Sequence, residues 1–304
     1  MSKPTLMTVF SGFGLVEVGA KEKGYEVISA IEYDPELAEV YRVNHGDHVR
    51  IEDIRKSNPK KFEKPDVFWA SPSCKGFSEA DARRGNKHHP DNALGLEIPK
   101  FIKYLKPDWV FIENVPKFYG TPAFTAIADC LNRLGYWVSY GVLDSANYGV
   151  PQYRKRLILT ANRSKSYHLP QQVSPVSWYQ QINDLIPTMT TASLTPVQQN
   201  AIANYSEPLL VERVGYYRSG PKVAQCGDRC WTLRASLADD RKSKGSRSQF
   251  INVVENGATY NLSPRGFARL MSVPDTFWLP ENVRVAITGL GNGVPCKFAS
   301  ALLP

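Results

Sequence analysis

The sequence predicts an α/β protein with a mostly parallel sheet covered on both faces, and a smaller second domain of irregular and β structure. In the first half, short apolar runs typical of buried strands alternate with stretches of helical periodicity. Such alternation implies parallel strands joined by helices. After about Arg163 the alternation stops, and proline, serine, glutamine and threonine become common up to Pro196. This change indicates where the second domain begins.

The strands and helices of the first half can be placed from their apolar patterns. We expect strands at 6–10, 26–32, 67–70, 109–113 and 138–143, and a further one at 157–160. We expect helices at 15–23, 35–44, 94–105 and 123–134. Pro35 and Pro122 lie near first-turn positions, and Gly24 and Gly135 are expected to cap the ends of two helices.

The second half divides into two parts. Between 211 and 254, short β-like pieces are broken by glycine and by a basic loop at 241–247. From Tyr260 onward, a helical stretch and a glycine-rich turn with a final helix indicate a return to the first domain. We therefore expect a first domain at 1–163, a second domain at 164–258, and a C-terminal segment at 259–304 that belongs with the first.

The composition fits a globular enzyme with a polyanionic partner. The chain has 304 residues and a formal net charge of +8, which favours nucleic acid through counterion release, although a basic enzyme without such a partner would look the same. No apolar run approaches the roughly 20 residues that cross a bilayer, so we expect no membrane span. The five cysteines are scattered, which predicts a reducing, cytoplasmic compartment. Because Cys226 and Cys230 lack a second ligand pair, we expect no metal site.

Glycines and acidic residues follow the first expected strands. Gly12 and Gly14 stand in the run FSGFG, where glycine lets the backbone approach a ligand at the carboxyl edge of a sheet. Glu32 ends the second strand, where a carboxylate can bind ribose hydroxyls, and Asp53 is either an adenine contact or a solvated turn residue. The glycine spacing differs from the dinucleotide fingerprint, which argues against nicotinamide cofactors. Glycine turns after strands are common, and together with Glu32 this one favours an adenosine-type cofactor.

A cysteine with a setting suited to nucleophilic catalysis follows the strand at 67–70. Cys74 comes after a proline-containing turn and before a long polar segment. The neighbouring Lys75 favours the thiolate, which is the reactive form. Most lone cysteines are inert core residues, and Cys130 in an amphipathic helix fits that description. We predict that Cys74 is the nucleophile.

Charged residues at two further positions are candidates for acid catalysis and anion binding. Glu113 ends the strand at 109–113, where a carboxylate is either a structural group or an acid of raised pKa. Gln152, Arg154 and Arg156 alternate along an expected strand and would therefore share one face. Two arginines on an inward face are costly unless they bind an anionic or highly polar group, and surface exposure is the alternative.

In order along the chain, these segments resemble the blocks of DNA (cytosine-5)-methyltransferases of the bacterial and phage type. The resemblance covers about 1–163 and 259–304, and each block alone is weak. The blocks are 10–14 for the cofactor, 71–78 for the nucleophile, 113–115 for the acid, 148–156 for the QxRxR pattern, 262–277 for the ninth block and 291–295 for the last. Six blocks in the family's order make a chance match very improbable. In the second domain, 231–236 resembles the block that often closes the target-recognition domain.

The resemblance implies a Rossmann-like catalytic domain that uses S-adenosylmethionine, and a mostly irregular and β target-recognition domain over 164–258. The implied reaction is methyl transfer to carbon 5 of a cytosine that is flipped out of duplex DNA. Cys74 would attack carbon 6, and protonated Glu113 would hold ring nitrogen 3 and the amine. Arg156 would contact the base carbonyl, Arg154 would support the pocket, and 75–93 would close over the DNA.

The resemblance also implies binding residues beyond the catalytic ones. Those expected to contact the cofactor are Phe10, Gly12, Gly14, Glu32, Tyr33, Asp53, Ile54, Pro72, Asn292 and Val294. Those expected to contact DNA are Ser78, Arg83, Arg84, Arg234, Arg241, Lys242 and Lys244.

The chain departs from the family beside the nucleophile, where the usual Pro-Cys-Gln is Ser73-Cys74-Lys75. In the first interpretation Lys75 is a lineage variant that contacts a DNA phosphate. In the second, its charge accommodates a carboxylate on the transferred carbon, so that carboxy-S-adenosylmethionine would yield 5-carboxymethylcytosine.

Other functions share the same sequence features. An RNA cytosine-5 methyltransferase could use the same fold, although the inserted second domain and its basic loop favour duplex DNA. A catalytically dead DNA-binding paralogue is disfavoured because Cys74, Glu113, Arg154 and Arg156 are all present. We expect a monomer, with a possible cognate restriction endonuclease that acts separately.

Overall fold

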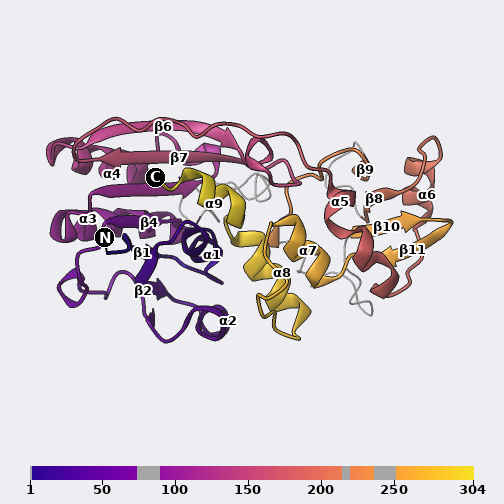
Figure 1. The fold of residues 1–304 in the computed structure, drawn as a ribbon, viewed down its shortest axis with the longest axis horizontal. Helices are drawn as coiled ribbons and strands as arrows, with labels where there is room; N and C mark the ends of the chain where they lie inside the picture. The colour runs from indigo at the N-terminus through magenta and orange to yellow at the C-terminus, as the bar shows by residue number, and fades with distance from the viewer. Residues whose placement is uncertain (1, 74–89, 214–219, 236–250) are drawn as a thin grey trace. The chain divides into compact units, whose positions relative to one another are not determined.

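The computed structural model describes residues 2–73, 90–213, 220–235 and 251–304 (Figure 1). The chain forms two compact units. Unit 1 comprises Met1–Asp144, Lys155–Gln171 and Ala299–Pro304, and unit 2 comprises Ser145–Arg154 and Gln172–Phe298. The functional division expected at 163/164 and 258/259 stays a prediction, and the compact units are bounded at other residues.

Unit 1 is built on one large sheet. Its strands are β1 (Thr5–Val9), β2 (Glu26–Glu32), β3 (Val49–Ile51), β4 (Val67–Ala70), β5 (Trp109–Asn114), β6 (Trp137–Asp144) and β7 (Lys155–Asn162). The seven strands lie in the order β3-β2-β1-β4-β5-β7-β6. β1 to β5 pair in parallel, whereas β7 is antiparallel to both β5 and β6. The predicted α/β class with a mostly parallel sheet is confirmed.

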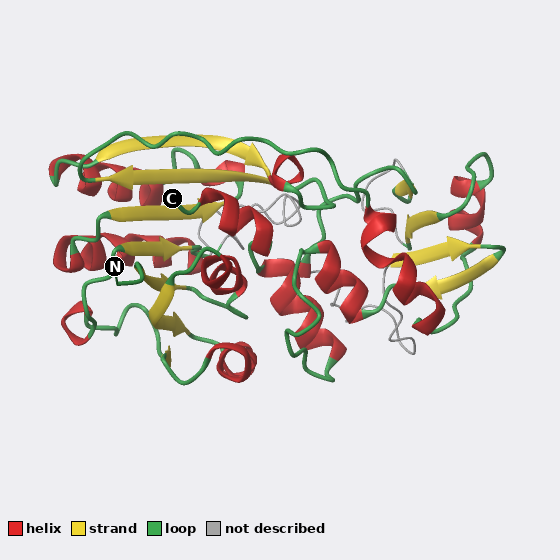
Figure 2. Cartoon of the chain, in the orientation of Figure 1, coloured by secondary structure: helices red, strands yellow, loops and turns green. Residues whose placement is uncertain are grey.

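Helices join the parallel strands of unit 1, as Figure 2 shows. They are α1 (Leu15–Glu22), α2 (Pro35–His45), α3 (Ile98–Leu105) and α4 (Pro122–Arg133), and a 3-10 segment, Pro90–Glu97, precedes α3. Gly24 and Gly135 follow α1 and α4 at φ angles of 86° and 78°, as the sequence predicted. A fully buried cluster joins the sheet to α3 and α4, and it includes Phe68, Phe101 and Ile127. This core holds the strand ends in fixed register.

Unit 2 contains a smaller antiparallel sheet with the order β11-β10-β8-β9. Its elements are α5 (Trp178–Ile182), α6 (Pro196–Ile202), β8 (Leu209–Glu212), β9 (Val223–Gln225), β10 (Ile251–Glu255), β11 (Ala258–Asn261), α7 (Pro264–Leu270) and α8 (Val283–Asn292). A last helix, α9 (Cys296–Leu302), ends the chain. The β pieces were predicted, but α5 and α6 were not. Both begin with a capping box, Ser177 with Gln180 and Thr195 with Gln198, a signal that the sequence carried.

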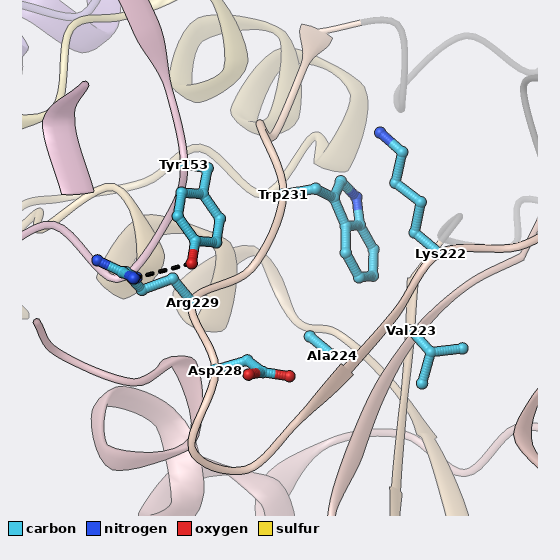
Figure 3. A pocket seen from close by; sticks show the side chains of 7 residues that line it. All are labelled: Tyr153, Lys222, Val223, Ala224, Asp228, Arg229 and Trp231. Carbon is cyan, nitrogen blue, oxygen red and sulfur yellow. Dashed lines mark hydrogen bonds between the residues drawn. The ribbon is translucent and has the colours of Figure 1, made fainter. Parts of the chain in front are cut away.

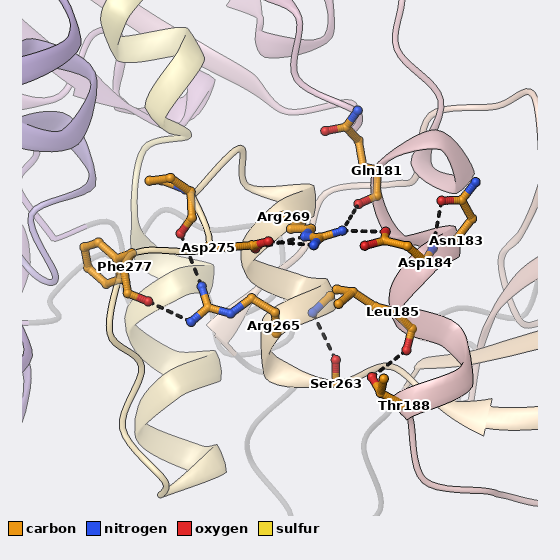
Figure 4. Close-up of polar contacts among 12 residues, drawn as sticks. Gln181, Asn183, Asp184, Leu185, Thr188, Ser263, Arg265, Arg269, Asp275 and Phe277 are labelled. Atoms are coloured by element: carbon orange, nitrogen blue, oxygen red, sulfur yellow. Dashed lines mark hydrogen bonds and ion pairs between the residues drawn. The ribbon is translucent and has the colours of Figure 1, made fainter.

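The segment that resembles the family's ninth block is a structural clamp within unit 2 (Figure 4). Arg269 of α7 contacts Asp184 and Asp275, each at 2.6 Å. Arg265, one turn earlier, donates to the carbonyls of Pro274 and Phe277 at 3.2 and 2.7 Å. The two arginines thus tie α7 to the turn after it and to the start of the 3-10 segment that follows α5.

The expected strand through Gln152, Arg154 and Arg156 is wrong in its first half. β7 begins at Lys155, and Gln152 lies in an isolated parallel bridge with Cys230. The Gln152 side chain donates to the Leu270 carbonyl at 2.9 Å and accepts from the Leu233 amide at 3.1 Å. These partners are distant in sequence, and they hold residues 145–154 in unit 2.

Candidate active site

The carboxyl ends of the parallel strands of unit 1 meet at one edge of the sheet. Val9 pairs with Ile31 and with Ala70, and Ala70 pairs with Ile112. The residues that follow in this row are therefore Phe10, Glu32, Ser71 and Glu113. In an open parallel sheet, ligands bind in the crevice outside this edge. The structure thus brings the predicted cofactor, nucleophile and acid segments to a single edge.

The turn after β1 has an unusual backbone. Phe10, Gly12 and Gly14 have positive φ angles of 61°, 56° and 80°, and such an angle is strained for a phenylalanine. A side chain at Gly14 would come within 2.4 Å of the His45 ring, so only glycine fits there. A side chain at Gly12 would meet no atom within 4 Å. The backbone at Gly12 therefore faces open space, as a ligand cradle requires.

Glu32 ties this turn to the end of β2. Its carboxylate accepts hydrogen bonds from the amides of Gly12 at 2.7 Å, Tyr33 at 2.8 Å and Asp34 at 2.9 Å. Burial raises the pKa of Glu32, and the three amide donors act in the opposite direction. Three amides leave acceptor capacity on the carboxylate for a ligand hydroxyl. The Tyr33 side chain is 71% exposed beside it.

The next two predicted cofactor residues, Asp53 and Ile54, differ in their surroundings: one forms an ion pair and the other is buried in the core. Asp53 follows β3, whose last residue Ile51 pairs with Glu32. Its carboxylate forms an ion pair with Arg55 at 2.6 Å, and the hydrogen bonds from that side chain lower the pKa of Asp53 to about 2. Ile54 is buried in the core of unit 1. Asp53 is therefore ionised at the sheet edge, and both roles stay predictions.

The described part of the nucleophile segment is fixed by the neighbouring strand. The Asn114 side chain donates to the Pro72 carbonyl at 2.8 Å, and the Trp69 indole donates to the Ser71 hydroxyl at 3.0 Å. Pro72 is buried. Cys74 itself lies outside the described residues, together with Lys75, Ser78, Arg83 and Arg84. The chain is thus anchored two residues before the predicted nucleophile.

Glu113 and Arg156 form an ion pair at the same edge. Arg156 Nε lies 2.8 Å from Glu113 Oε1, and the two side chains are 12% and 7% exposed. Antiparallel pairing of β5 with β7 brings them together, since Glu113 pairs with Ile158 two residues after Arg156. Arg156 also donates to the Lys155 carbonyl at 2.8 Å. The sequence singled out both residues, and the structure adds that they are direct partners.

Arg154 is a structural residue of unit 2. Its side chain is 1% exposed and donates to the carbonyls of Leu233, Gly291 and Gly293 at 2.8, 2.9 and 2.8 Å. The backbones it joins are tightly packed, because a side chain at Gly291 would come within 2.2 Å of the Ala235 amide. We call Arg154 and these carbonyls the arginine junction. The expected role of Arg154 in supporting the base pocket stays a prediction.

The other predicted binding residues of unit 2 have varied surroundings. Asn292 is exposed at the end of α8, whereas Val294 is buried. Arg234 lies 3.6 Å from the buried carboxylate of Glu212. Arg241, Lys242 and Lys244 lie outside the described residues. Their DNA contacts stay predictions.

A cavity of about 350 Å³ opens on unit 2 (Figure 3). Arg229 lies over the Tyr153 ring, 4.5 Å from its centre, and donates to the Tyr153 hydroxyl at 2.8 Å. On the other side stand Lys222 and Trp231, whose buried Nε1 has no hydrogen-bond partner in the described chain. The lining residues are Tyr153, Lys222, Val223, Ala224, Asp228, Arg229 and Trp231. The sequence pattern does not reveal this grouping of cationic and aromatic side chains, because its members come from separate segments of the chain.

A second missed residue is Glu17. It is 0% exposed, on the same face of α1 as the buried Val16 and Ala20. A charged residue in an apolar helical phase was the available signal.

Among the residues that the structure describes, no group of His, Cys, Asp and Glu is arranged to hold a metal ion. Within the same residues, no helix has the length and apolar character to cross a membrane.

Comparison with known proteins identifies relatives of the whole chain. The family model described as C-5 cytosine-specific DNA methylase matches residues 5–303. The Type II methyltransferase M.BsuFI of Bacillus subtilis is 31% identical over 305 residues, which cover 99% of this chain and 71% of the relative. The Type II methyltransferase M.HhaI of Haemophilus parahaemolyticus is 24% identical, over 94% of this chain and 89% of the relative.

Solved structures show the same fold. The methyltransferase EhMeth of Entamoeba histolytica has a TM-score of 0.74 at 16% identity, covering 99% of this chain and 97% of the other. A DNA modification methyltransferase described as putative, from a prophage of E. coli, has a TM-score of 0.68 at 18% identity, with 99% and 97% covered.

Proposed function

The chain belongs to the family of C-5 cytosine-specific DNA methylases, and we propose that it methylates duplex DNA through a covalent Cys74 intermediate with S-adenosylmethionine as the methyl donor. The family assignment makes it a DNA (cytosine-5)-methyltransferase. The observation that carries the finer proposal is the Glu113–Arg156 pair, which stands at the same sheet edge as the glycine turn and the segment that leads to Cys74.

The residues at the ends of β1 and β2 fit S-adenosylmethionine. The open space at Gly12 admits a ligand next to the backbone, and Glu32 keeps acceptor capacity for a ribose hydroxyl. Tyr33 and Asp53 border the same edge, where an adenine ring needs a flat neighbour and a hydrogen-bond acceptor. When bound, S-adenosylmethionine supplies a methyl group on a positively charged sulfur. The protein's part is to bind and orient it against the base.

Glu113 and Arg156 would act together on the cytosine. Their side chains are 2.8 Å apart, so they can reach neighbouring polar atoms on one edge of the base. A protonated Glu113 would donate to ring nitrogen 3 and accept from the exocyclic amine, and Arg156 would donate to the carbonyl. These contacts stabilise the charge that develops in the ring as carbon 6 is attacked. The base must first leave the duplex, because its ring atoms are stacked within it.

Cys74 provides the electron pair that activates carbon 5. Its thiolate forms a bond to carbon 6, and the electrons of the double bond between carbons 5 and 6 move onto carbon 5. S-adenosylmethionine held at Gly12 and Glu32 would supply the methyl group to carbon 5, and its sulfur would keep the electron pair of the broken bond as a neutral thioether. A base then removes the hydrogen of carbon 5, the double bond forms again, and the thiolate leaves carbon 6. The Asn114–Pro72 hydrogen bond would hold the start of this segment in place.

The cavity on unit 2 is suited to a DNA backbone. Lys222 and Arg229 can pair with phosphate oxygens, while Tyr153 and Trp231 offer flat surfaces for sugar or base. In this proposal unit 2 positions the duplex, and Lys75, Ser78, Arg83, Arg84, Arg234, Arg241, Lys242 and Lys244 add further contacts.

The transferred group is methyl in this proposal, and Lys75 contacts a DNA phosphate. Nothing in the relatives' names favours a carboxylated donor. We also propose that the enzyme acts as a monomer in the cytoplasm, apart from any cognate restriction endonuclease, since strand-by-strand methylation needs a single active site.

The test is nucleoside mass spectrometry of DNA treated with the purified protein and S-adenosylmethionine, beside a Cys74→Ala control. We expect 5-methylcytosine with the wild-type protein and none with the variant. Parallel reactions with carboxy-S-adenosylmethionine and with RNA separate the alternatives. A carboxymethyl product would assign Lys75 to the donor, and a product confined to RNA would overturn the DNA substrate.

A further inference from the structure

The buried carboxyl group of Glu17, in the helix that follows the glycine turn, takes no part in the proposed catalytic mechanism. Glu17 of α1 is 0% exposed, and its Oε1 is hydrogen-bonded to Thr8 Oγ1 of β1. Its Oε2 makes no hydrogen bond of normal geometry within the described chain, although the Tyr41 hydroxyl faces the same group. An ionised carboxylate with so few partners is costly in a protein interior.

The contact with Thr8 is the start of a chain of hydrogen bonds. Thr8 Oγ1 lies 2.7 Å from Ser11 Oγ, and Ser11 Oγ donates to the Ile31 carbonyl at 3.2 Å. There are three contacts in this row: the Glu17 carboxyl with Thr8, Thr8 with Ser11, and Ser11 with the Ile31 carbonyl. Each of the two hydroxyl groups carries a single hydrogen. Two hydroxyl hydrogens cannot fill three hydrogen bonds, so all three are filled at once only when a protonated Glu17 carboxyl donates to Thr8; with Glu17 ionised, Thr8 is the donor to the carboxylate. An ionised Glu17 would turn both hydroxyls toward itself and leave Ile31 without the Ser11 hydroxyl.

This row of hydrogen bonds ends at Ser11, in the part of the glycine turn where the backbone is strained. Ser11 lies between Phe10 and Gly12, whose φ angles are 61° and 56°. A strained backbone persists only where its surroundings fix it. Ser11 is fixed to the end of β2 by its amide and its hydroxyl, both on the Ile31 carbonyl, next to Glu32. The state of Glu17 therefore acts on the residues that cradle the cofactor.

We propose that Glu17 is a positioning residue for the cofactor turn, and that its protonated carboxyl is the first donor of a relay through Thr8 and Ser11 to the Ile31 carbonyl. The inference rests on the proposed function, because it takes the turn to be the S-adenosylmethionine site. It adds a consequence: the turn loses a hydrogen bond, and the cofactor is bound less tightly, when Glu17 ionises.

The surroundings of Glu17 let it ionise near neutral pH. Burial raises the pKa of Glu17 to about 7, against the effects of Thr8, its own backbone, Tyr41 and Lys21. Lys21, on the same helix, lies 3.0 Å from the His45 ring, and Tyr41 lies 2.9 Å from the His48 ring. Burial lowers the pKa of His45 to about 3, and it also lowers the pKa values of His48 and Lys21. Both histidines are therefore neutral at the pH where Glu17 changes charge.

The test is calorimetric binding of S-adenosylhomocysteine, whose sulfur is uncharged, at pH 6 and pH 8.5. We expect the wild-type protein to bind about fivefold more weakly at the higher pH, which corresponds to one lost hydrogen bond. Glu17→Gln keeps an amide donor at every pH and should bind equally at both. Glu17→Leu, of similar size but without a donor, should bind weakly at both, and thermal unfolding checks that each variant is folded.

Two outcomes separate this inference from the function on which it rests. If the wild-type protein and Glu17→Gln lose affinity equally with pH, or if Glu17→Leu matches the wild-type protein at pH 6, the relay is wrong although the cofactor site stands. If no form binds S-adenosylhomocysteine at either pH, the proposed function fails and the relay fails with it. Infrared difference spectra give a second readout: a protonated carboxyl band that disappears near pH 7 and is missing in Glu17→Gln.

Discussion

The sheet edge of unit 1 and the arginine junction of unit 2 use two arginines that are two residues apart in the chain. Arg156 pairs with a single carboxylate, Glu113, and its side chain is 12% exposed. Arg154 is 1% exposed, and its guanidinium donates to three backbone carbonyls from distant segments. A side-chain partner can be exchanged for a substrate, whereas backbone carbonyls in a packed region cannot. The first arrangement suits chemistry and the second suits folding.

Because of this difference, substitutions in the two regions should affect different measured quantities. Changes at the sheet edge should lower the rate of methyl transfer and leave the free energy of unfolding nearly constant. Changes at the arginine junction should lower the free energy of unfolding and leave the rate per folded molecule unchanged, so that the total rate falls only with the folded fraction. A sheet-edge variant that loses mainly stability, or an arginine-junction variant that loses mainly the rate per folded molecule, would show that its region has been assigned wrongly.

The largest effect is expected for Glu113→Gln. The amide keeps the shape of the side chain but cannot supply the proton, so the rate should fall by roughly 10²–10⁴-fold. The free energy of unfolding should change by less than about 1 kcal/mol, since a polar partner for Arg156 remains. Methyl transfer and denaturant unfolding measure the two quantities. Glu97→Gln, in a half-buried ion pair with Lys100 at 2.9 Å, is the matched control and should alter neither.

Arg154→Met should have the largest effect on stability. The change leaves three backbone carbonyls, two of them in buried contacts, without their donor, which should cost roughly 3 kcal/mol or more. The exposed ion-paired Arg42→Met, on unit 1, should cost less than about 1 kcal/mol. If Arg154→Met were as stable as the wild-type protein but inactive, Arg154 would belong to the active site.

The buried Glu17 predicts a dependence of stability on pH. Its pKa is raised in the folded protein, so the folded state holds the proton more tightly than the unfolded chain does. Its contribution is fully present below the unfolded value of 4.5 and is lost as the pH rises through about 7. The loss is on the order of 3 kcal/mol. Unfolding of Glu17→Gln should lack this part of the pH dependence, and equal curves for both proteins would contradict it.

The smallest effects are expected at the cavity of unit 2. Lys222→Ala and Arg229→Ala should each reduce the slope of log affinity against log salt by about 0.9, the value for one phosphate contact. The exposed Lys60→Ala, on unit 1, is the control and should leave the slope unchanged. Unchanged slopes for both unit 2 variants would place the DNA on another surface.

The sheet edge could be predicted from sequence because its signals are local. The strands end at Val9, Glu32, Ala70 and Asn114, and the parallel sheet brings these ends together. Each of the predicted residues Phe10, Glu32 and Glu113 follows from the end of its own strand. The pairing of Glu113 with Arg156 depends on the antiparallel direction of β7; the sequence pattern predicted a strand at 157–160 but not its direction.

The arginine junction could not be predicted in the same way. Gln152 and Arg154 alternate like strand residues, but their partners are Leu233, Leu270 and Gly291, which lie far along the chain. Tertiary hydrogen bonds decided the conformation there, and the local pattern was misleading. Glu17 is an intermediate case, because its apolar helical phase was visible in the sequence while the relay through Thr8 was not.

The most direct test of the central claim is trapping on a duplex that carries 5-fluorocytosine. Fluorine at carbon 5 cannot leave as a proton does, so an active thiolate stays bound to the base after methyl transfer. With S-adenosylmethionine, the wild-type protein should form a complex with the duplex that survives denaturing electrophoresis, Arg42→Met should form it equally well, and Cys74→Ala should form none. A stable adduct with Cys74→Ala, or none with the folded wild-type protein, would contradict the mechanism.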